Sequence, residues 1–435
     1  MTMIEFQNKI DHFIDRYCEQ YHYSGVLRIT HRDQVLYERS MGYADWEKKI
    51  PMDRNRHFTM YSLSKPFCAI GLLLLVDQGL VSLDAHPAVY VPEAAGFDSR
   101  VTIRNMLLHS SGMPDFGKYM RELDIPNTNW YGKARELVLA DAKFPQEFVP
   151  GTNTQYANIN FTLAALVIEN VTGMDYADYM RERVFEPLGM LNTLVDRPGL
   201  NIADRAVGHD YSGDRILRKD CDVSWMLGAG DVLSTVADVY RLNLAIKHRK
   251  LLKPETWEQV LTPSPLSQFG FGCSVTQWHG KKRITHNGGH QGFRTLHIQL
   301  PEDDFDIILL SNCGFGDSRN TISEAIYAAF YGEDEGNSQT VEMDAGYIQA
   351  FEAASGSEHS PIRLTEEESS NWLGIYEGLT LTEESDGYRI RTNTGREMIC
   401  DYIGNGLFAN RFVDERYRVI CSKGEVMLLG NRKIK

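Results

Sequence analysis

The sequence has 435 residues, of which 43% are hydrophobic and 24% are charged, and these shares are ordinary for folded globular proteins. The length exceeds what one hydrophobic core usually supports, so we expect a large domain and a small one. A formal net charge of -14 repels phosphate backbones and anionic lipids, which argues against nucleic acid as a partner.

The first predicted element is an amphipathic helix over residues 4–20, whose apolar side chains recur mostly at spacings of three and four. Two strands follow at 25–30 and 34–40, separated by a charged turn at 31–33. The chain begins with acidic residues among scattered apolar ones, unlike a secretory signal, so we expect a cytoplasmic protein. The longest apolar run, 67–76, is about half of a membrane-spanning helix, so no membrane partner is expected.

A second strand pair is predicted at 295–300 and 306–311, and the stretch between the two pairs is mostly helical. Strands at both ends with helices between them predict an α+β fold. In this fold an antiparallel sheet, flanked by helices, carries an inserted helical subdomain.

The C-terminal part of the chain has a different character. From residue 336 to 368 the composition shifts toward Glu, Asp, Ser and Gly, which predicts a linker with one short helix near 347–353. We therefore expect a large domain over residues 1–335 and a small antiparallel β-barrel-like domain over 369–435. The strands expected in the small domain are 372–381, 388–392, 397–403, 407–412, 416–421 and 426–429.

The sharpest local signal is the segment Ser62-Leu63-Ser64-Lys65, which precedes Pro66 and the long apolar run. A serine and a lysine three residues apart share one face of a helix, so the amine can reach the hydroxyl. Pro66 suits a first helical turn and places the helix start near Ser62. A Ser hydroxyl needs an adjacent base, and a buried neutral lysine can act as one. Such a short pattern also arises by chance in a chain of this size.

Tyr156 and Asn158 form a second polar segment, just before a predicted helix at 161–171. Residues two apart on an extended loop point the same way. The phenol would then serve proton transfer, and the amide would bind a substrate carbonyl or N–H. A Tyr-x-Asn segment alone is usually an ordinary loop.

The third segment is His286-Asn287-Gly288-Gly289, which follows a strand-like run. A glycine pair in or beside a strand permits close approach of a substrate backbone. An exposed N–H there can complete an oxyanion hole with the N–H of Ser62. A lone histidine is more often structural than catalytic, so the case for His286 depends on the other two segments.

Signals for other chemistry are weaker. The seven cysteines are scattered without a Cys-x-x-Cys pair, and the nearest histidine pair, His286 and His290, lacks the helical setting of a zinc site. We expect no metal and no cofactor. The Gly112–Lys118 segment has a phosphate-loop spacing, but Tyr119 stands where that loop needs Ser or Thr. The sequence contains no Gly-x-Ser-x-Gly elbow.

In order, the three segments resemble the S-x-x-K, Y-x-N and K-T-G or H-x-G motifs of the serine β-lactamase and penicillin-binding-protein superfamily, and the class C enzymes in particular. The resemblance spans about residues 20 to 330. The tail is similar to the β-barrel appendages of D-aminopeptidases. Other segments that look like those of the family are Thr102–Pro114, Glu186–Met190 and Gly228–Thr235.

The resemblance implies a role for each of these residues. Ser62 would attack an acyl carbonyl while Lys65 and Tyr156 share the proton transfers. Asn158 would orient the substrate, and the N–H groups of Ser62 and Gly289 would hold the oxyanion. His286 stands in the place of the third-motif lysine, where a cation or donor meets a substrate carboxylate or supports the tyrosine. Asn287 replaces the usual hydroxyl residue, which argues against efficient β-lactam hydrolysis.

The expected function is therefore a serine hydrolase that acts through an acyl-enzyme on short peptides, amides or esters. The resemblance favours a D-amino-acid-specific peptidase or a carboxypeptidase-like enzyme. The alternatives are a carboxylesterase, a weak β-lactamase, or a catalytically silent penicillin-binding or regulatory protein on the same fold. Because several agreeing roles outweigh one motif, the enzyme is favoured. The expected partner is a small molecule or short peptide, and a homo-oligomer is left open.

Overall fold

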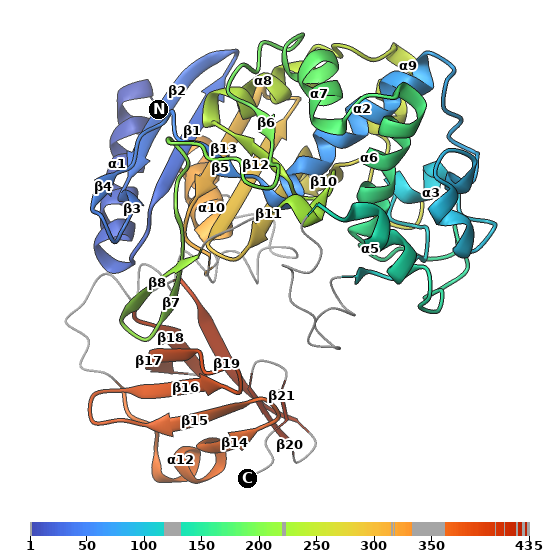
Figure 1. The fold of residues 1–435 in the computed structure, drawn as a ribbon. Coiled ribbons are helices and arrows are strands. Elements are labelled where there is room, and N and C mark those ends of the chain that lie inside the picture. The colour runs from blue at the N-terminus through green and yellow to red at the C-terminus, as the bar shows by residue number, and fades with distance from the viewer. Residues whose placement is uncertain are drawn as a thin grey trace.

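The computed structural model describes residues 2–116, 132–219, 223–314, 316, 318–332, 362–404, 406–412, 414–422, 425–428 and 431–432. A large domain of helices and sheet lies above a smaller, mostly β domain formed by the end of the chain (Figure 1). This arrangement confirms the predicted α+β fold with an inserted helical subdomain and a C-terminal barrel-like domain.

The central sheet has six strands in the order β10-β11-β12-β13-β1-β2, and every neighbouring pair is antiparallel. Both predicted strand pairs are present as the hairpins β1–β2 and β12–β13. The first and last parts of the domain meet where β1 pairs with β13, with Gly25 opposite Ser311. The strands are β1 (Gly25–His31), β2 (Gln34–Met41), β10 (Ser274–Trp278), β11 (Lys281–His290), β12 (Phe293–Leu300) and β13 (Phe305–Ser311).

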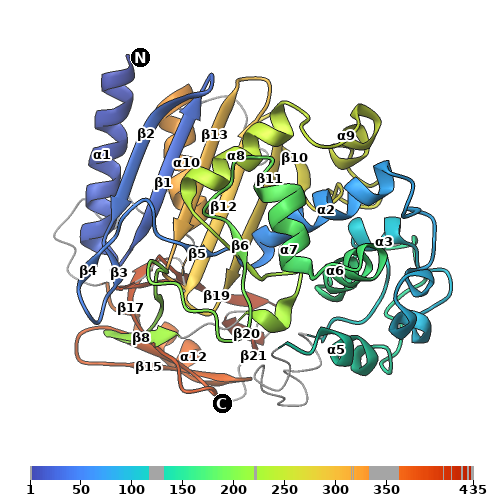
Figure 2. The ribbon, with the colours of Figure 1, turned by 45° about the horizontal axis from the view of Figure 1, so that its top comes forward.

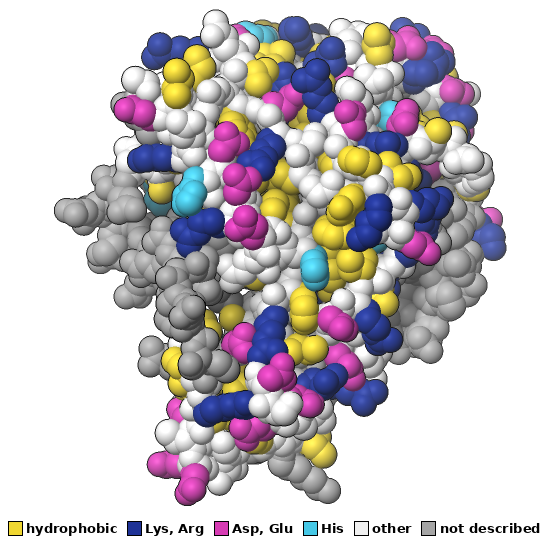
Figure 3. Space-filling model, turned by 90° about the vertical axis from the view of Figure 1, so that its left-hand side faces the viewer, with side chains coloured by type: hydrophobic (Ala, Val, Ile, Leu, Met, Phe, Trp, Pro, Cys, Tyr) yellow, Lys and Arg dark blue, Asp and Glu magenta, His cyan; other side chains and the backbone are white. Residues whose placement is uncertain are grey.

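One face of the sheet is covered by α1 (Met3–Gln20) and α10 (Ser318–Tyr331), the two ends of the large domain. The predicted amphipathic helix is α1, which begins with a capping box and buries its apolar stripe against the sheet. Figure 2 shows α10 behind the sheet and α8 (Val236–Lys247) in front of it. The surface on the side of α1 carries interspersed acidic and basic side chains (Figure 3). Arg39 of β2 forms an ion pair with Asp11 of α1 at 3.1 Å.

The helical subdomain packs around two helices that are apolar on all sides, α2 (Lys65–Asp77) and α6 (Ile159–Thr172). They contact each other and share one core with the second face of the sheet. A small sheet in the order β5-β9-β6 joins this core to the chain just before Ser62. The remaining elements here are β5 (Phe58–Thr59), α3 (Ile103–Leu107), α5 (Ala134–Asp141), α7 (Tyr176–Met180), β6 (Leu194–Val195), β9 (Val232–Ser234) and α9 (Pro254–Val260).

The C-terminal domain is an antiparallel meander in which consecutive strands pair in chain order. The predicted run 372–381 is not one strand, because a capped helix, α12 (Glu366–Trp372), ends inside it and a turn at Gly378 divides the rest. The predicted helix near 347–353 lies outside the described residues. The strands are β14 (Gly374–Tyr376), β15 (Leu379–Glu383), β16 (Tyr388–Thr392), β17 (Glu397–Gly404), β18 (Leu407–Asn410), β19 (Arg416–Ser422), β20 (Glu425–Leu428) and β21 (Asn431–Arg432).

The small domain docks on the large one through a hairpin of β7 (Gly208–Ser212) and β8 (Arg215–Lys219). The Gly213 N–H donates to the carbonyl of Glu397 at 2.7 Å, and the Glu397 N–H donates to Ser212 Oγ at 3.0 Å. At a second contact, buried Asp414 accepts bonds from the hydroxyls of Tyr17 and Thr321. In the described part of the chain, no helix is both long and apolar enough to cross a bilayer.

Candidate active site

Ser62 lies in a short 3₁₀ helix, Tyr61–Ser64, that continues directly into α2. Pro66 occupies the first turn of α2, as the sequence predicted. The preceding residue, Tyr61, has a φ of 46°, a left-handed conformation that is uncommon for a residue with a side chain. Ser62 is thus held on a tight turn at the start of a buried helix.

Lys65 is fully buried behind Ser62 and has three hydrogen-bond partners. Its Nζ lies 3.1 Å from Ser62 Oγ, 2.9 Å from Asn158 Oδ1 and 2.7 Å from the carbonyl oxygen of Ala229. Burial lowers the pKa of Lys65 to about 7, although the negative charge of Asp115 opposes the shift. A neutral amine can donate to the two carbonyl-type oxygens, which leaves its lone pair for the proton of Ser62.

Tyr156 lies on the other side of Ser62, and its phenol donates to Ser62 Oγ at 2.6 Å. Burial raises the pKa of Tyr156 well above its ordinary value, so the phenol keeps its proton at neutral pH. Its ring stacks on the buried imidazole of His109, with 4.4 Å between centroids and 24° between planes. Because His109 also accepts the Ala157 N–H at 3.2 Å, it fixes both the ring and the backbone beside it.

Asn158 is the N-cap of α6, with helical dihedral angles instead of the extended ones expected from the sequence. Its amide oxygen accepts from Lys65, while its backbone N–H donates to Asp115 Oδ1 at 3.1 Å. Its side-chain N–H groups also face the Asp115 carboxylate. In this structure the Asn158 amide therefore holds Lys65, and its orientation is in turn set by Asp115.

The third segment, His286-Asn287-Gly288-Gly289, lies within β11, next to the 3₁₀ helix that carries Ser62. A Cβ on Gly288 would stand 1.9 Å from the carbonyl oxygen of Met60, so only glycine lets this strand lie against the turn that carries Ser62. The imidazole of His286 is buried and its Nδ1–H donates to the carbonyl of Asn287 at 2.7 Å. Burial lowers the pKa of His286 to about 3. The direction of this shift favours a neutral histidine, which can act as a hydrogen-bond donor or acceptor.

A cavity of about 410 Å³ is lined in part by Ser62. Of the predicted site residues, Ser62, Tyr156, His286, Asn287 and Gly289 line it, whereas Lys65, Asn158 and Gly288 lie outside its wall. Its other lining residues are Gln268, Phe269, Ser274, Thr285, Arg294 and Arg319.

Sequence reasoning missed several residues of this site. Asp115 directly follows a segment that resembled the family, and Ala229 lies inside another, but neither had a role predicted. Ala229 acts through a backbone carbonyl, which carries no residue-type signal. Arg294 and Arg319 reach the cavity from β12 and α10, and only the fold brings them there.

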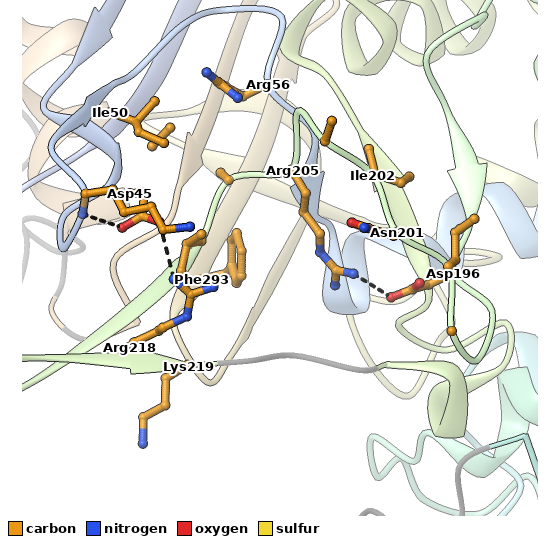
Figure 4. Close-up of a pocket in the computed structure, with 18 of the residues that line it drawn as sticks. Asp45, Ile50, Arg56, Asp196, Asn201, Ile202, Arg205, Arg218, Lys219 and Phe293 are labelled. Carbon is orange, nitrogen blue, oxygen red and sulfur yellow. Dashed lines mark hydrogen bonds and ion pairs between the residues drawn. The ribbon is translucent and has the colours of Figure 1, made fainter.

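A larger cavity, of about 530 Å³, contains none of the predicted site residues. Arg205 and Arg218 in its wall lie in ion pairs with Asp196 at 3.0 Å and with Asp45 at 3.2 Å (Figure 4). Across the described chain, no group of three or more His, Cys, Asp or Glu side chains is placed to hold a metal ion.

Comparison with known proteins identifies the family of the chain. A sequence profile described as Beta-lactamase matches residues 8–329, which is most of the chain. The chain belongs to the beta-lactamase family. Within this family it is 29% identical to penicillin-binding protein 4* of Bacillus subtilis strain 168, over 70% of this chain and 72% of that protein.

Two other proteins that are similar to this chain have names that describe reactions at D-amino acids. The chain is 24% identical to a D-aminopeptidase of Cereibacter sphaeroides strain KD131, over 86% of this chain and 68% of that protein. It is also similar to the crystal structure of D-amino acid amidase from Ochrobactrum anthropi SV3 in complex with D-phenylalanine. That likeness has a TM-score of 0.64 and 25% identity, and it covers 75% of this chain and 98% of the amidase.

Proposed function

We propose that the protein is a serine hydrolase that forms an acyl-enzyme at Ser62, with short D-amino-acid peptides or amides as its substrates. The observation that carries the proposal is the placement of Ser62 Oγ between Lys65 Nζ at 3.1 Å and Tyr156 Oη at 2.6 Å. A nucleophile within hydrogen-bond reach of both a base and an acid is the arrangement that acyl transfer needs.

In the proposed acylation, neutral Lys65 takes the proton of Ser62 as Oγ forms a bond with the substrate's carbonyl carbon. A lysine whose pKa is about 7 suits this task, because much of it is unprotonated at neutral pH. The negative charge that develops on the carbonyl oxygen would be stabilised by the N–H groups of Ser62 and Gly289, which line the same cavity.

When the bond to the leaving group breaks, Tyr156 donates its phenolic proton to the departing nitrogen or oxygen. The ammonium of Lys65 then returns its proton to the phenolate, so that both residues are restored. Water then hydrolyses the ester of Ser62 by the same path in reverse. Tyr156 passes its proton to Lys65 and takes up a proton from water, and Lys65 returns a proton to Ser62 Oγ as the ester bond breaks. These acylation and hydrolysis steps need no external oxidant, reductant or cofactor.

The substrate class is proposed on two grounds. The relatives named for D-aminopeptidase and D-amino acid amidase activity support substrates with a D-residue. The cavity of about 410 Å³ has room for a dipeptide-sized molecule and lies at the lower end of typical ligand pockets. Asn287 stands where a hydroxyl residue is usual, which disfavours β-lactams.

The proposal is tested by labelling and by a substrate panel. A fluorophosphonate should modify the peptide that contains Ser62, as located by mass spectrometry, and Ser62→Ala should abolish the adduct. The panel comprises a D-alanyl dipeptide, a D-amino acid amide, short nitrophenyl esters and a chromogenic cephalosporin. Hydrolysis of the D-residue substrates with a higher kcat/KM than the others is expected.

A matched control is Ser64→Ala, since Ser64 is buried and donates no proton to the site but accepts the Val232 N–H at 3.0 Å. An adduct on Ser64 instead of Ser62 contradicts the assignment of the nucleophile. Faster turnover of the esters identifies a carboxylesterase. Absence of any adduct or turnover by the folded protein identifies a silent binding protein.

A further inference from the structure

The larger cavity, of about 530 Å³, is separate from the cavity at Ser62, and no described residue lines both (Figure 4). Its wall is formed by parts of residues 44–56, 196–208 and 218–219, together with Phe293 of β12. A volume of this size is ordinary for a small-molecule site. The protein therefore has room for a second ligand away from the proposed catalytic centre.

The wall of this second cavity is rich in basic side chains. Two acidic side chains, Asp45 and Asp196, are among its described lining residues. The six basic ones are Lys48, Arg56, Arg197, Arg205, Arg218 and Lys219. Because the whole protein has a net charge of -14, the charge of this wall is opposite in sign to that of the molecule. A cavity lined by an excess of positive charge attracts anions.

The two acidic side chains of the wall are each held by an arginine. Asp196 lies 3.0 Å from Arg205, and Asp45 lies 3.2 Å from Arg218 (Figure 4). Both carboxylates are almost completely buried, so removing either partner would leave a costly unpaired charge. These two ion pairs therefore hold the wall in place.

Two of the other basic groups are able to bind a ligand. The guanidinium of Arg56 lies 3.3 Å from Asp204, whose side chain is 73% exposed. An ion pair with an exposed partner contributes little, so an anion in the cavity can compete for Arg56. The ammonium of Lys48 forms no ion pair with any described residue. Arg197 and Lys219 pair with acidic side chains outside the wall.

The cavity also has an apolar part. Its apolar lining side chains include Ala44, Ile50, Leu200, Ile202, Ala206, Val207 and Phe293. An inorganic ion would leave these side chains in contact with water, whereas a hydrocarbon or aromatic group would cover them. An organic anion with an apolar body therefore matches the cavity better than an inorganic ion does.

Phe293 and Arg205 connect this cavity with the turn that carries Ser62. The ring of Phe293 lies 6.2 Å from the ring of Tyr61, between centroids, and Arg205 Nη2 donates to Thr59 Oγ1 at 3.0 Å. Tyr61, directly before Ser62, has the left-handed φ of 46°. Such a conformation persists only while its surroundings hold it. A ligand that shifts Phe293 or Arg205 would therefore alter the placement of Ser62.

We propose that this cavity is a regulatory site that binds an organic anion with an apolar body, and that its occupancy changes the reactivity of Ser62. The anionic group is bound by Arg56 and Lys48, and the apolar body covers the side chains around Phe293. The effect on Ser62 rests on the proposed serine-hydrolase function, whereas the binding of the anion does not.

Binding is tested with anilinonaphthalene sulfonate, an aromatic anion whose fluorescence rises in apolar surroundings. Phenylnaphthylamine has the same apolar body without the sulfonate. We expect the full-length protein to bind the anionic dye at least about tenfold more tightly, as a charge-assisted hydrogen bond suggests. Decanoate and phenyl phosphate then compete with the dye, and the better competitor shows whether a carboxylate on a chain or a phosphate on a ring is preferred. Equal affinity for the two dyes, or displacement by neither competitor, overturns the inference.

Variants locate the bound dye. Arg56→Gln and Lys48→Gln together should weaken binding at least about tenfold. Ala203→Trp should abolish binding, because Ala203 lines the cavity and a large ring there occupies its space. Arg54→Gln is the matched control, since Arg54 is 63% exposed, pairs with Glu38 and is not a lining residue, so it should keep the wild-type affinity. Wild-type affinity in the double variant or in Ala203→Trp overturns the inference.

The effect on Ser62 is measured by the rate of fluorophosphonate labelling. Saturating dye should change this rate by about fivefold or more, as is typical of coupled sites, and the change should disappear in Ala203→Trp. An unchanged rate with bound dye overturns the regulatory role. So does an equal change in Ala203→Trp, because the dye then acts at another place. A wild-type protein that is not labelled even without dye contradicts the proposed hydrolase function instead, and the dye titrations then decide the binding site by themselves.

Discussion

The side-chain oxygen of Asn158 lies 2.9 Å from Nζ of Lys65, so the asparagine of the second motif holds the lysine of the first. Because Lys65 is fully buried, an acceptor lost there cannot be replaced freely by bulk water. Asn158→Ala should therefore slow acylation by about tenfold or more. The rate of fluorophosphonate labelling at Ser62 measures this effect. A variant that is labelled at the wild-type rate would show that the contact has no role in acylation.

Lys65 and Tyr156 contact the same oxygen of Ser62, so we expect them to act as one unit. Lys65→Ala and Tyr156→Phe should each reduce kcat by several orders of magnitude, and the double variant should lose far less than the product of the two losses. A kinetic double-mutant cycle checks this. Additive losses would mean that the two residues do not share a proton path.

Acylation should depend on pH through Lys65, whose pKa is about 7. The base is active when unprotonated, so kcat/KM should rise with pH and level off above the pKa. The charge of Asp115 raises the pKa of Lys65, so Asp115→Asn should move the inflection to lower pH. The labelling rate between about pH 5 and pH 9 measures both. An inflection that moves to higher pH in Asp115→Asn would contradict this account.

Gly288→Ala should damage both stability and activity, because the added Cβ would meet the Met60 carbonyl at 1.9 Å and displace β11 from the nucleophile turn. A loss of about 1–3 kcal/mol in unfolding free energy is expected, together with slower labelling. Gly96→Ala is the control. Its added Cβ would lie 3.1 Å from the methyl group of Ala142, so a small shift of the two groups accommodates it. Equal effects of the two changes would argue against the clash.

Asp414 connects the small domain to the large one, since its carboxylate accepts the hydroxyls of Tyr17 and Thr321 in a buried setting. Asp414→Ala should leave both hydroxyls without this acceptor and lower stability by about 1–3 kcal/mol. Thermal unfolding and limited proteolysis between the domains measure this. Asp386→Ala removes an exposed partner of Arg411 and should change neither readout.

The sequence predicted the parts of the fold that depend on local pattern. Hydrophobic periodicity predicted the apolar stripe of α1 and the buried helix after Ser62. Alternating runs and turn residues predicted the two central hairpins. The three sequence motifs were enough to predict that Ser62, Lys65 and Tyr156 lie together, as they do in the structure. The sequence motif did not predict that Asn158 is the N-cap of α6, because an N-cap and a loop residue look alike in sequence.

What escaped prediction depends on long-range contact. His286 was expected as a possible cation, but its charge state is set by burial, which comes from surrounding strands and helices. Arg294 lies only five residues after Gly289 in the sequence, yet its place beside the cavity follows from the strand register that sets the two residues opposite each other. The contact of Lys65 with the carbonyl of Ala229 could not be predicted either, because every residue has a backbone carbonyl.

The pairing of β1 with β13 has a consequence for how the protein is made. Ser311 Oγ donates to the carbonyl of Ser24, and these residues are 287 positions apart in the chain. During synthesis the N-terminal hairpin must wait for most of the polypeptide to leave the ribosome before its partner strand exists. Contacts of such long range slow folding and leave an unpaired strand edge open to wrong partners. The nascent chain should therefore need protection by chaperones until the last strand of the large domain has emerged.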